Sequence, residues 1–192
     1  MGLPQQTARL TPAEYLEIER AAEFRHEYLD GEMLGMSGGS RQHSAIKLNV
    51  AFELRRQLQG RPCQPFDSDM RIKTSPTSYA YPDFSVVCGD QEFDDDKGDT
   101  LLNPTLLVEV LSDSTEAYDR GRKFASYRQI SSLREYVLIS QKSPIVERYL
   151  RNPDDTWTLT AVLGLEASIH LPTIDVTLPL AEIYDRVSFD AP

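Results

Sequence analysis

The sequence predicts a mixed α/β (α+β) fold in which helices flank a central mixed sheet. Three observations lead to this class. Residues 105–112 form an apolar run of strand length that is rich in branched residues, which is typical of a buried strand. A helical pattern and a second apolar strand follow it, and this order indicates a β-α-β unit. Nearer the N-terminus, a helix start at Thr11-Pro12 precedes a hairpin turn at Asp30-Gly31.

The N-terminal half is predicted to contain a helix, a hairpin, a long helix and two strands. Thr11 caps the first helix and Glu14 completes a capping box. Ser40 caps the second helix, whose apolar residues recur at helical spacing. We expect these elements at residues 12–22 (helix), 24–29 and 32–36 (hairpin), 41–59 (helix), and 62–66 and 69–73 (strands).

The C-terminal half is predicted to complete the sheet and add a β extension. Tyr81-Pro82-Asp83 opens a strand, since proline favours extended geometry before it and is tolerated where a strand begins. We expect a polar loop at 74–80, strands at 84–88 and 105–112 around an exposed acidic loop at 89–103, a helix at 119–130, strands at 134–139, 144–151, 156–163 and 167–177, and a helix at 178–184.

Length and composition limit the possible classes of protein. At 192 residues we expect one domain, residues 11–188, after a flexible lead at 1–10. The net charge of −10 argues against binding nucleic acid by bulk charge, although it leaves room for a local basic surface. The sequence has no signal-peptide core and no membrane-length apolar run, so we expect a soluble, cytoplasmic protein without membrane contacts. Cys63 and Cys88 lack metal-binding spacing and are expected to be small core side chains rather than a disulfide.

One carboxylate lies in the middle of the apolar strand 105–112. Strand alternation places Leu107, Glu109 and Leu111 on one face, so Glu109 points the same way as two leucines. An unpaired carboxylate there is costly. Glu109 must therefore be protonated, paired with a cation or bound to a metal.

A second acid, Asp83, begins a neighbouring strand. Asp83 and Glu109, with the backbone carbonyl of Val110 nearby, offer the hard oxygen ligands that Mg²⁺ (or Mn²⁺) takes together with water and phosphate oxygens. Lys123 lies on the helix that follows. Its ammonium group is expected to enter the same pocket and steady a phosphate.

The order of these residues resembles the nuclease superfamily named for its P-D…(D/E)-x-K signature. More narrowly, residues 10–185 resemble the Uma2 family of restriction-endonuclease-like nucleases. The matching segments are Glu27-Tyr28-Leu29-Asp30-Gly31-Glu32, Gly38-Gly39-Ser40 with His43, Tyr81-Pro82-Asp83, Glu109-Val110-Leu111-Ser112, Asp119 with Lys123, and Tyr127.

This resemblance implies a restriction-endonuclease-like core, Mg²⁺-dependent hydrolysis of phosphodiester bonds in DNA, and a homodimer. The superfamily lysine belongs two residues after the strand glutamate, where this chain has Leu111. The resemblance therefore implies a migrated lysine, with Lys123 as the candidate, and adds Glu27 as a helper carboxylate.

The predicted mechanism is metal-assisted hydrolysis. Asp83 and Glu109 hold the ion, and Lys123 stabilises developing negative charge. His43, at a helix start, assists proton transfer or contacts a phosphate. Asp119 and Tyr127 share the helix face of Lys123 and are assigned a supporting role.

Other interpretations of the same residues stay open. Glu109 can form a structural ion pair with Arg120, Arg122 or Lys123, and Asp119 with Lys123 can be a plain helix salt bridge. His43 can serve as a capping or surface residue. At the level of function, the alternatives are a non-catalytic dimeric binding module that retains the nuclease fold, and a phosphodiesterase that acts on small substrates.

Overall fold

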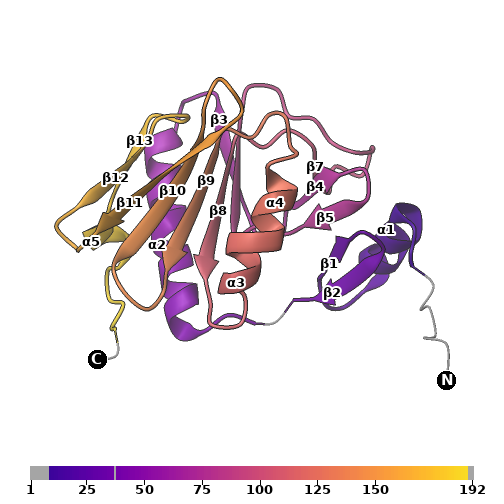
Figure 1. Ribbon diagram of the computed structural model, residues 1–192, viewed down its shortest axis with the longest axis horizontal. Helices are drawn as coiled ribbons and strands as arrows, with labels where there is room; N and C mark the ends of the chain where they lie inside the picture. The colour runs from indigo at the N-terminus through magenta and orange to yellow at the C-terminus, as the bar shows by residue number, and fades with distance from the viewer. Residues whose placement is uncertain (1–8, 37, 190–192) are drawn as a thin grey trace.

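A six-stranded mixed sheet forms the centre of the protein (Figure 1). The computed structural model describes residues 9–36 and 38–189, so most of the predicted lead lies outside the described residues. Strands β8 and β9 are parallel, and the other neighbouring pairs of this sheet are antiparallel. The spatial order is β11 (Trp157–Leu163), β10 (Ile145–Arg151), β9 (Glu135–Ser140), β8 (Leu106–Leu111), β6 (Phe84–Cys88) and β3 (Cys63–Asp67).

The connection from β8 to β9 is helical, as predicted. It consists of α3 (Glu116–Tyr118), the π-helical turn η1 (Asp119–Lys123) and α4 (Phe124–Tyr127). The predicted span of 119–130 was wrong at both ends. The helix begins at Glu116, whose amide donates to the Ser112 carbonyl at 2.9 Å, so its first turn lies before Asp119. Such π turns are uncommon and are frequent at functional sites.

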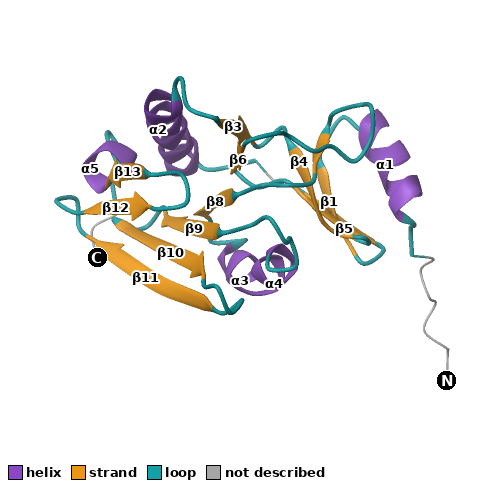
Figure 2. Cartoon of the chain, turned by 90° about the horizontal axis from the view of Figure 1, so that it is seen from above, coloured by secondary structure: helices purple, strands orange, loops and turns teal. Residues whose placement is uncertain are grey.

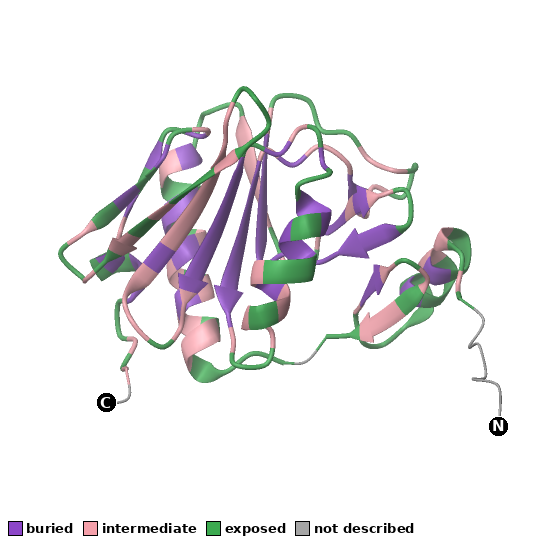
Figure 3. Cartoon of the chain, viewed as in Figure 1, coloured by how far each residue is buried: buried purple, intermediate pink, exposed green. Residues whose placement is uncertain are grey.

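Different elements cover the two faces of the central sheet (Figure 2). Helix α2 (Arg41–Leu58) packs on one face with the short α5 (Leu180–Ile183), and α3 and α4 lie on the other. Every residue of β8 is buried between them (Figure 3). The predicted alternation is confirmed, with Leu106, Val108 and Val110 in the core on the α2 side and Leu107 and Leu111 in the core on the α4 side.

A second, smaller sheet and helix α1 (Pro12–Ala21) form the N-terminal side of the molecule. The strands of this sheet lie in the order β2 (Glu32–Gly35), β1 (His26–Leu29), β5 (Ser78–Ala80), β4 (Arg71–Ser75) and β7 (Thr100–Leu101). The capping box and the hairpin are confirmed, and Asp30 and Gly31 both take the positive φ that a tight hairpin turn requires. The polar loop predicted at 74–80 was wrong, because β5 pairs there with both β1 and β4.

The acidic loop 89–103 is exposed at Asp90, Glu92 and Asp96, as its composition predicted, but other acids of the loop form ion pairs with the rest of the molecule. Asp99 pairs with Arg20 of α1 at 2.8 Å and with the buried Arg71 at 2.9 Å. Asp94 pairs with Lys73 at 2.7 Å. The loop therefore fastens α1 to the small sheet, and it contains β7.

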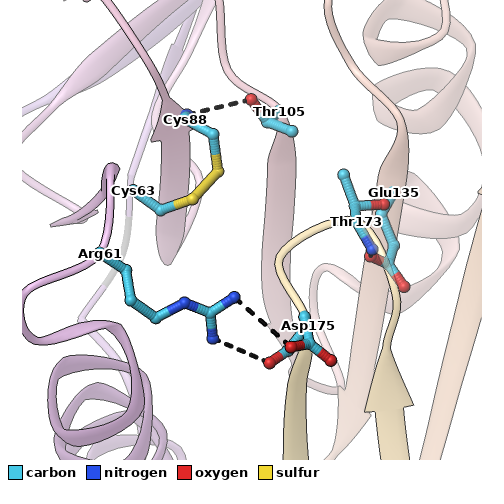
Figure 4. The surroundings of a disulfide bond; sticks show 7 residues. All are labelled: Arg61, Cys63, Cys88, Thr105, Glu135, Thr173 and Asp175. Atoms are coloured by element: carbon cyan, nitrogen blue, oxygen red, sulfur yellow. Dashed lines mark hydrogen bonds and ion pairs between the residues drawn. A yellow bond between two sulfur atoms is a disulfide. The ribbon is translucent and has the colours of Figure 1, made fainter.

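The two cysteines form a disulfide, which corrects the prediction that they are separate core side chains (Figure 4). The antiparallel register of β3 and β6 places Cys63 directly opposite Cys88, with their Cα atoms 4.0 Å apart. The Cys88 amide donates to the hydroxyl of Thr105 at 3.2 Å, just before β8. The bond therefore closes the β3–β6 edge of the central sheet.

The C-terminal β extension is confirmed with one correction. Residues 167–177, predicted as one strand, instead belong to the hairpin of β12 (Ser168–Leu171) and β13 (Val176–Pro179). The helix predicted at 178–184 is the shorter α5. No helix in the described ranges is long and apolar enough to span a membrane.

Candidate active site

A cavity of about 960 Å³ opens between the β1–β2 hairpin, the start of α2, the ends of β6 and β8, and the helix that follows β8. Its size is at the upper end of the range for ligand pockets. The predicted residues that line it are Glu27, His43, Asp83, Glu109, Val110, Asp119 and Lys123. Tyr127 lies behind this surface and is fully buried.

Asp83 follows Pro82 and lies immediately before β6, at the end of the strand that borders the cavity. The β6–β8 register pairs Phe84 with Val108, so Asp83 and Glu109 come next to each other at the end of that pairing. The Asp83 amide donates to a Glu109 carboxylate oxygen at 3.4 Å, and the Val110 amide donates to the Asp83 carboxylate at 2.8 Å. The strand register alone therefore brings the two acids together.

Two basic side chains from α2 also face Asp83. His43 Nε2 lies 3.1 Å from one carboxylate oxygen and Lys47 Nζ lies 3.0 Å from the other. Burial alone raises the pKa of Asp83, but His43, Lys47 and the Val110 amide outweigh it and lower that pKa to about 2. Asp83 is therefore held as a carboxylate at neutral pH.

Glycine 39 explains how His43 approaches this position. A Cβ atom at Gly39 would lie 2.6 Å from His43 Nδ1, which is closer than side chains allow. The Ser40 hydroxyl accepts the His43 amide at 3.0 Å and caps α2. The predicted capping role is thus filled by Ser40, and the His43 ring is free to turn toward Asp83.

Glu109 is buried in the middle of β8 with one oxygen doubly engaged. Lys123 Nζ lies 2.8 Å from Oε1, and the Tyr127 hydroxyl donates to the same oxygen at 2.7 Å. Burial above all, with smaller contributions from Asp119 and Asp83, raises the pKa of Glu109 to about 8 against the opposing effect of Lys123. The pocket therefore imposes a high cost on a negative charge at Glu109.

Lys123 lies at the end of the π turn and is only 6% exposed. Its ammonium group contacts Glu109, Glu27 at 2.9 Å and Asp119 at 3.6 Å. Burial lowers its pKa, but these carboxylates raise it well above the ordinary value. Lys123 is thus a permanent cation. Arg120, which the sequence offered as another possible ion-pair partner of Glu109, pairs with Glu116 and Glu147 instead.

Glu27 links the N-terminal hairpin to this cluster. It lies on β1 and accepts the Tyr81 amide at 3.2 Å while it pairs with Lys123. Tyr81 in turn precedes Pro82 and Asp83. Glu27 therefore connects the segment that carries Asp83 with the helix that carries Lys123.

Sequence reasoning missed Lys47. It follows His43 by one helical turn on α2, so the i, i+4 spacing of two cations on a partly polar face was the available signal. The Ser68 hydroxyl accepts from Lys47 Nζ at 2.9 Å, which holds the ammonium group toward Asp83. The sequence also named the carbonyl of Val110, whereas the contact with Asp83 is made by its amide.

The donor set fits a cation of the Mg²⁺ type and does not fit a metal held by protein alone. In residues 9–36 and 38–189 no three Asp, Glu, His or Cys side chains are arranged to hold an ion. Mg²⁺ needs only one or two carboxylates, which Asp83 and Glu109 supply, and takes water and phosphate oxygens for the remainder. The carboxylates that line the cavity outnumber its lysines and Arg25, and the raised pKa of Glu109 shows that its carboxylate form needs a nearby positive charge.

A family model described as "Putative restriction endonuclease", named Uma2, matches residues 12–181. The chain belongs to the Uma2 family. Two proteins of Synechocystis sp. (strain ATCC 27184 / PCC 6803 / Kazusa) are similar. "Uncharacterized protein slr1290" is 36% identical over 94% of both chains, and "Uncharacterized protein sll1609" is 37% identical over 85% of this chain and 93% of its own.

A crystal structure confirms the predicted restriction-endonuclease-like fold of this Uma2 protein. It is described as "a putative nuclease belonging to DUF820" from Anabaena variabilis ATCC 29413. The match has a TM-score of 0.77 and covers 93% of this chain and 99% of that chain at 17% identity. At that identity, the likeness concerns the fold.

Proposed function

We propose that this Uma2 protein is a metal-dependent endonuclease that hydrolyses phosphodiester bonds in DNA, with Mg²⁺ or Mn²⁺ as its ion. The observation that carries the proposal is the meeting of Asp83 and Glu109, from neighbouring strands, in a cavity that also holds Lys123. The description of the family and the nuclease fold support the same reaction.

Asp83 and Glu109 are the residues that would hold the ion. A bound divalent ion supplies Lewis-acid polarisation of the phosphate and makes nearby water more acidic. Asp83 is ready for this role because His43, Lys47 and the Val110 amide keep it ionised. The Tyr127 hydroxyl fixes the orientation of Glu109.

Lys123 takes the place of the superfamily lysine in this proposal. Because its pKa is raised well above the ordinary value, it acts as a fixed positive charge and not as a base. Such a charge stabilises the negative charge that develops on a phosphate under attack. Glu27 and Asp119 hold the ammonium group in position from either side.

His43 and Lys47 are the groups available for proton transfer and phosphate contact on the opposite wall. The His43 ring is within hydrogen-bond reach of Asp83, at 3.1 Å, and imidazole is the side chain that most often transfers protons in enzymes. Lys47 brings a second ammonium group to the Asp83 side of the cavity. Both come from the first turns of α2, which is rigidly packed in the core.

Cleavage of supercoiled plasmid tests the proposal. We expect nicking or linearisation with Mg²⁺ or Mn²⁺, none with EDTA, and loss of cleavage in Asp83→Asn. Phe52→Ala is the control, because Phe52 is an exposed residue of α2 that does not line the cavity. An intact plasmid under all ion conditions, with the wild-type protein folded, rejects the endonuclease.

A small phosphodiester is the second candidate substrate. The net charge of −10 and the carboxylates of the cavity oppose a long polyanion more than a small one. Turnover of bis(p-nitrophenyl) phosphate without plasmid cleavage favours this candidate.

A further inference from the structure

Phe24 is an aromatic side chain in solvent at the wall of the cavity. At 74% it is the most exposed large apolar side chain of the described chain. It lies in the turn between α1 and β1 and lines the cavity together with Leu34 and Met36 of the neighbouring strand segment. It belongs to none of the apolar cores of the described residues. Phe52, by contrast, is exposed on α2 away from the cavity.

The backbone around Phe24 is fixed, so its exposure is not that of a loose loop. The Met36 amide donates to the Arg25 carbonyl at 2.9 Å, which extends the β1–β2 pairing to the residue next to Phe24. The Arg25 guanidinium pairs with Asp69 at 2.7 Å, donates to the Ser68 carbonyl, and lies 5.9 Å from the centre of the Tyr81 ring. The ring of Phe24 is therefore presented from a braced segment beside Tyr81, which leads into Asp83.

The charges of the same cavity do not favour a duplex. Intact DNA is bound mainly through phosphate contacts with Lys and Arg. Here Lys47 and Lys123 are paired with carboxylates, Arg25 is paired with Asp69, and Glu23 and Asp113 add negative charge to the lining. A nucleic acid bound in this cavity must gain affinity from contacts other than phosphate pairing.

We propose that Phe24 is a stacking surface for an unpaired nucleobase, and that the cavity takes a single-stranded or frayed nucleotide in preference to intact duplex DNA. This inference rests on the proposed function, because the phosphate of the stacked nucleotide is placed at Asp83 and Glu109. Aromatic rings bind single strands by stacking with little dependence on sequence or charge. In a duplex the faces of each base are covered by stacking on the neighbouring base pairs, so the face that Phe24 would contact is not available.

Binding in EDTA tests the inference without cleavage. The probe is a fluorescently labelled 12-nucleotide single-stranded DNA, compared with its blunt duplex by anisotropy. We expect the wild type to bind the single strand at least about fivefold more tightly, and Phe24→Ala to weaken single-strand binding by roughly fivefold to a hundredfold. Phe24→Tyr keeps the ring and is expected to stay within about twofold. Phe24→Leu keeps only apolar character and is expected to behave like the alanine variant.

Two controls separate stacking from other roles of Phe24. Phe52→Ala, the exposed aromatic outside the cavity, is expected to leave binding unchanged. A single strand with 2-aminopurine is expected to lose fluorescence when bound by the wild type and to keep it with Phe24→Leu.

Several results overturn the inference. The first is that Phe24→Ala binds the single strand as tightly as the wild type does. The second is that the wild type binds the duplex as tightly as the single strand, or more tightly. The third is that the wild type binds neither DNA detectably. A fourth is that the wild type self-associates and that Phe24→Ala abolishes this association without changing single-strand binding. Phe24 would then contact a second copy of the protein and not a nucleobase. Plasmid cleavage with Mg²⁺ is scored separately, so failure of the stacking surface and failure of the endonuclease give different results.

Discussion

Glu109 and Glu135 are both buried glutamates on adjacent parallel strands of the central sheet, and they face opposite sides of it. Glu109 lies with the residues of β8 that pack on α4. Glu135 begins β9, on the face where Val137 and Ile139 pack toward α2. Each stands in an apolar strand, although Glu109 lies inside β8 and Glu135 is the first residue of β9.

Their surroundings are very different. Glu109 has an ammonium group at 2.8 Å, a tyrosine hydroxyl at 2.7 Å and a second acid beside it, and it lines a cavity. Glu135 has the Thr173 amide at 3.3 Å and Arg148 Nε at 3.7 Å. Its other oxygen and Arg148 Nε have no hydrogen-bond partner among the described residues.

The comparison shows that a buried acid in a strand is a weak indicator of a site by itself. A buried acid indicates only that some nearby group offsets the free-energy cost of removing the carboxyl group from water. For Glu135 the compensation is partial and local, and burial raises its pKa despite Thr173 and Arg148. For Glu109 it comes from separate elements that meet around a cavity. We therefore expect substitution of the two glutamates to affect different properties.

Replacing each glutamate by glutamine is expected to give the largest contrast. Glu109→Gln removes a carboxylate that we propose holds the metal, and it should reduce Mn²⁺-dependent plasmid cleavage by roughly a thousandfold. Glu135→Gln, outside the cavity, should change the rate by less than about threefold. Initial rates at equal folded concentration measure both. Equal losses in the two variants would remove the distinction between site and core.

Removing the cation beside each glutamate is expected to separate them in stability. Lys123→Met leaves Glu109, Glu27 and Asp119 without their shared partner, and we expect a loss of about 3 kcal/mol. Arg148→Met should cost less than about 1 kcal/mol, since its contact with Glu135 is long and poorly formed. Urea unfolding measures the two differences. A larger loss for Arg148→Met contradicts this assignment of the buried charges.

The parts of the fold that depend on local pattern were predictable from the sequence. Strand β6 was predicted at its observed bounds, and the capping box of Thr11 and the turn at Asp30-Gly31 were found where local chemistry requires them. The faces of β8, and hence the direction of Glu109, follow from strand alternation alone.

The parts that depend on long-range register were not predictable. Strand β5 has three residues and exists because β1 and β4 lie on either side of it. The disulfide follows from the pairing of Cys63 with Cys88 across two strands, which sequence separation does not reveal. Lys47 was missed for the same reason. Its role depends on contact with Asp83, which lies 36 positions away in the sequence.

A smaller effect is expected from the hydroxyl that orients Glu109. Tyr127→Phe removes its 2.7 Å hydrogen bond and should cost about 1 kcal/mol and slow cleavage by roughly threefold to tenfold. Tyr136→Phe is the matched control, because that buried hydroxyl donates to the Asp119 carbonyl and not to Glu109. A wild-type cleavage rate in Tyr127→Phe would remove the orienting role while leaving that of Glu109 intact.

The smallest effect is a slope in the pH dependence of stability, and it belongs to Glu135. Burial raises its pKa in the folded protein above the value of about 4.5 expected when unfolded. Between these two values the folded state binds a proton that the unfolded state has released, so stability falls as pH rises through the window, by less than about 1.4 kcal/mol per pH unit. Glu135→Gln cannot titrate and should lack this decline. Urea unfolding from pH 4 to 8 should therefore show the wild type losing stability relative to Glu135→Gln as pH rises. If the difference in free energy of unfolding between the two proteins stays constant with pH, Arg148 and Thr173 keep Glu135 ionised. Glu109 and Glu135 would then have equally well compensated charges, and only the access of Glu109 to the cavity would distinguish them.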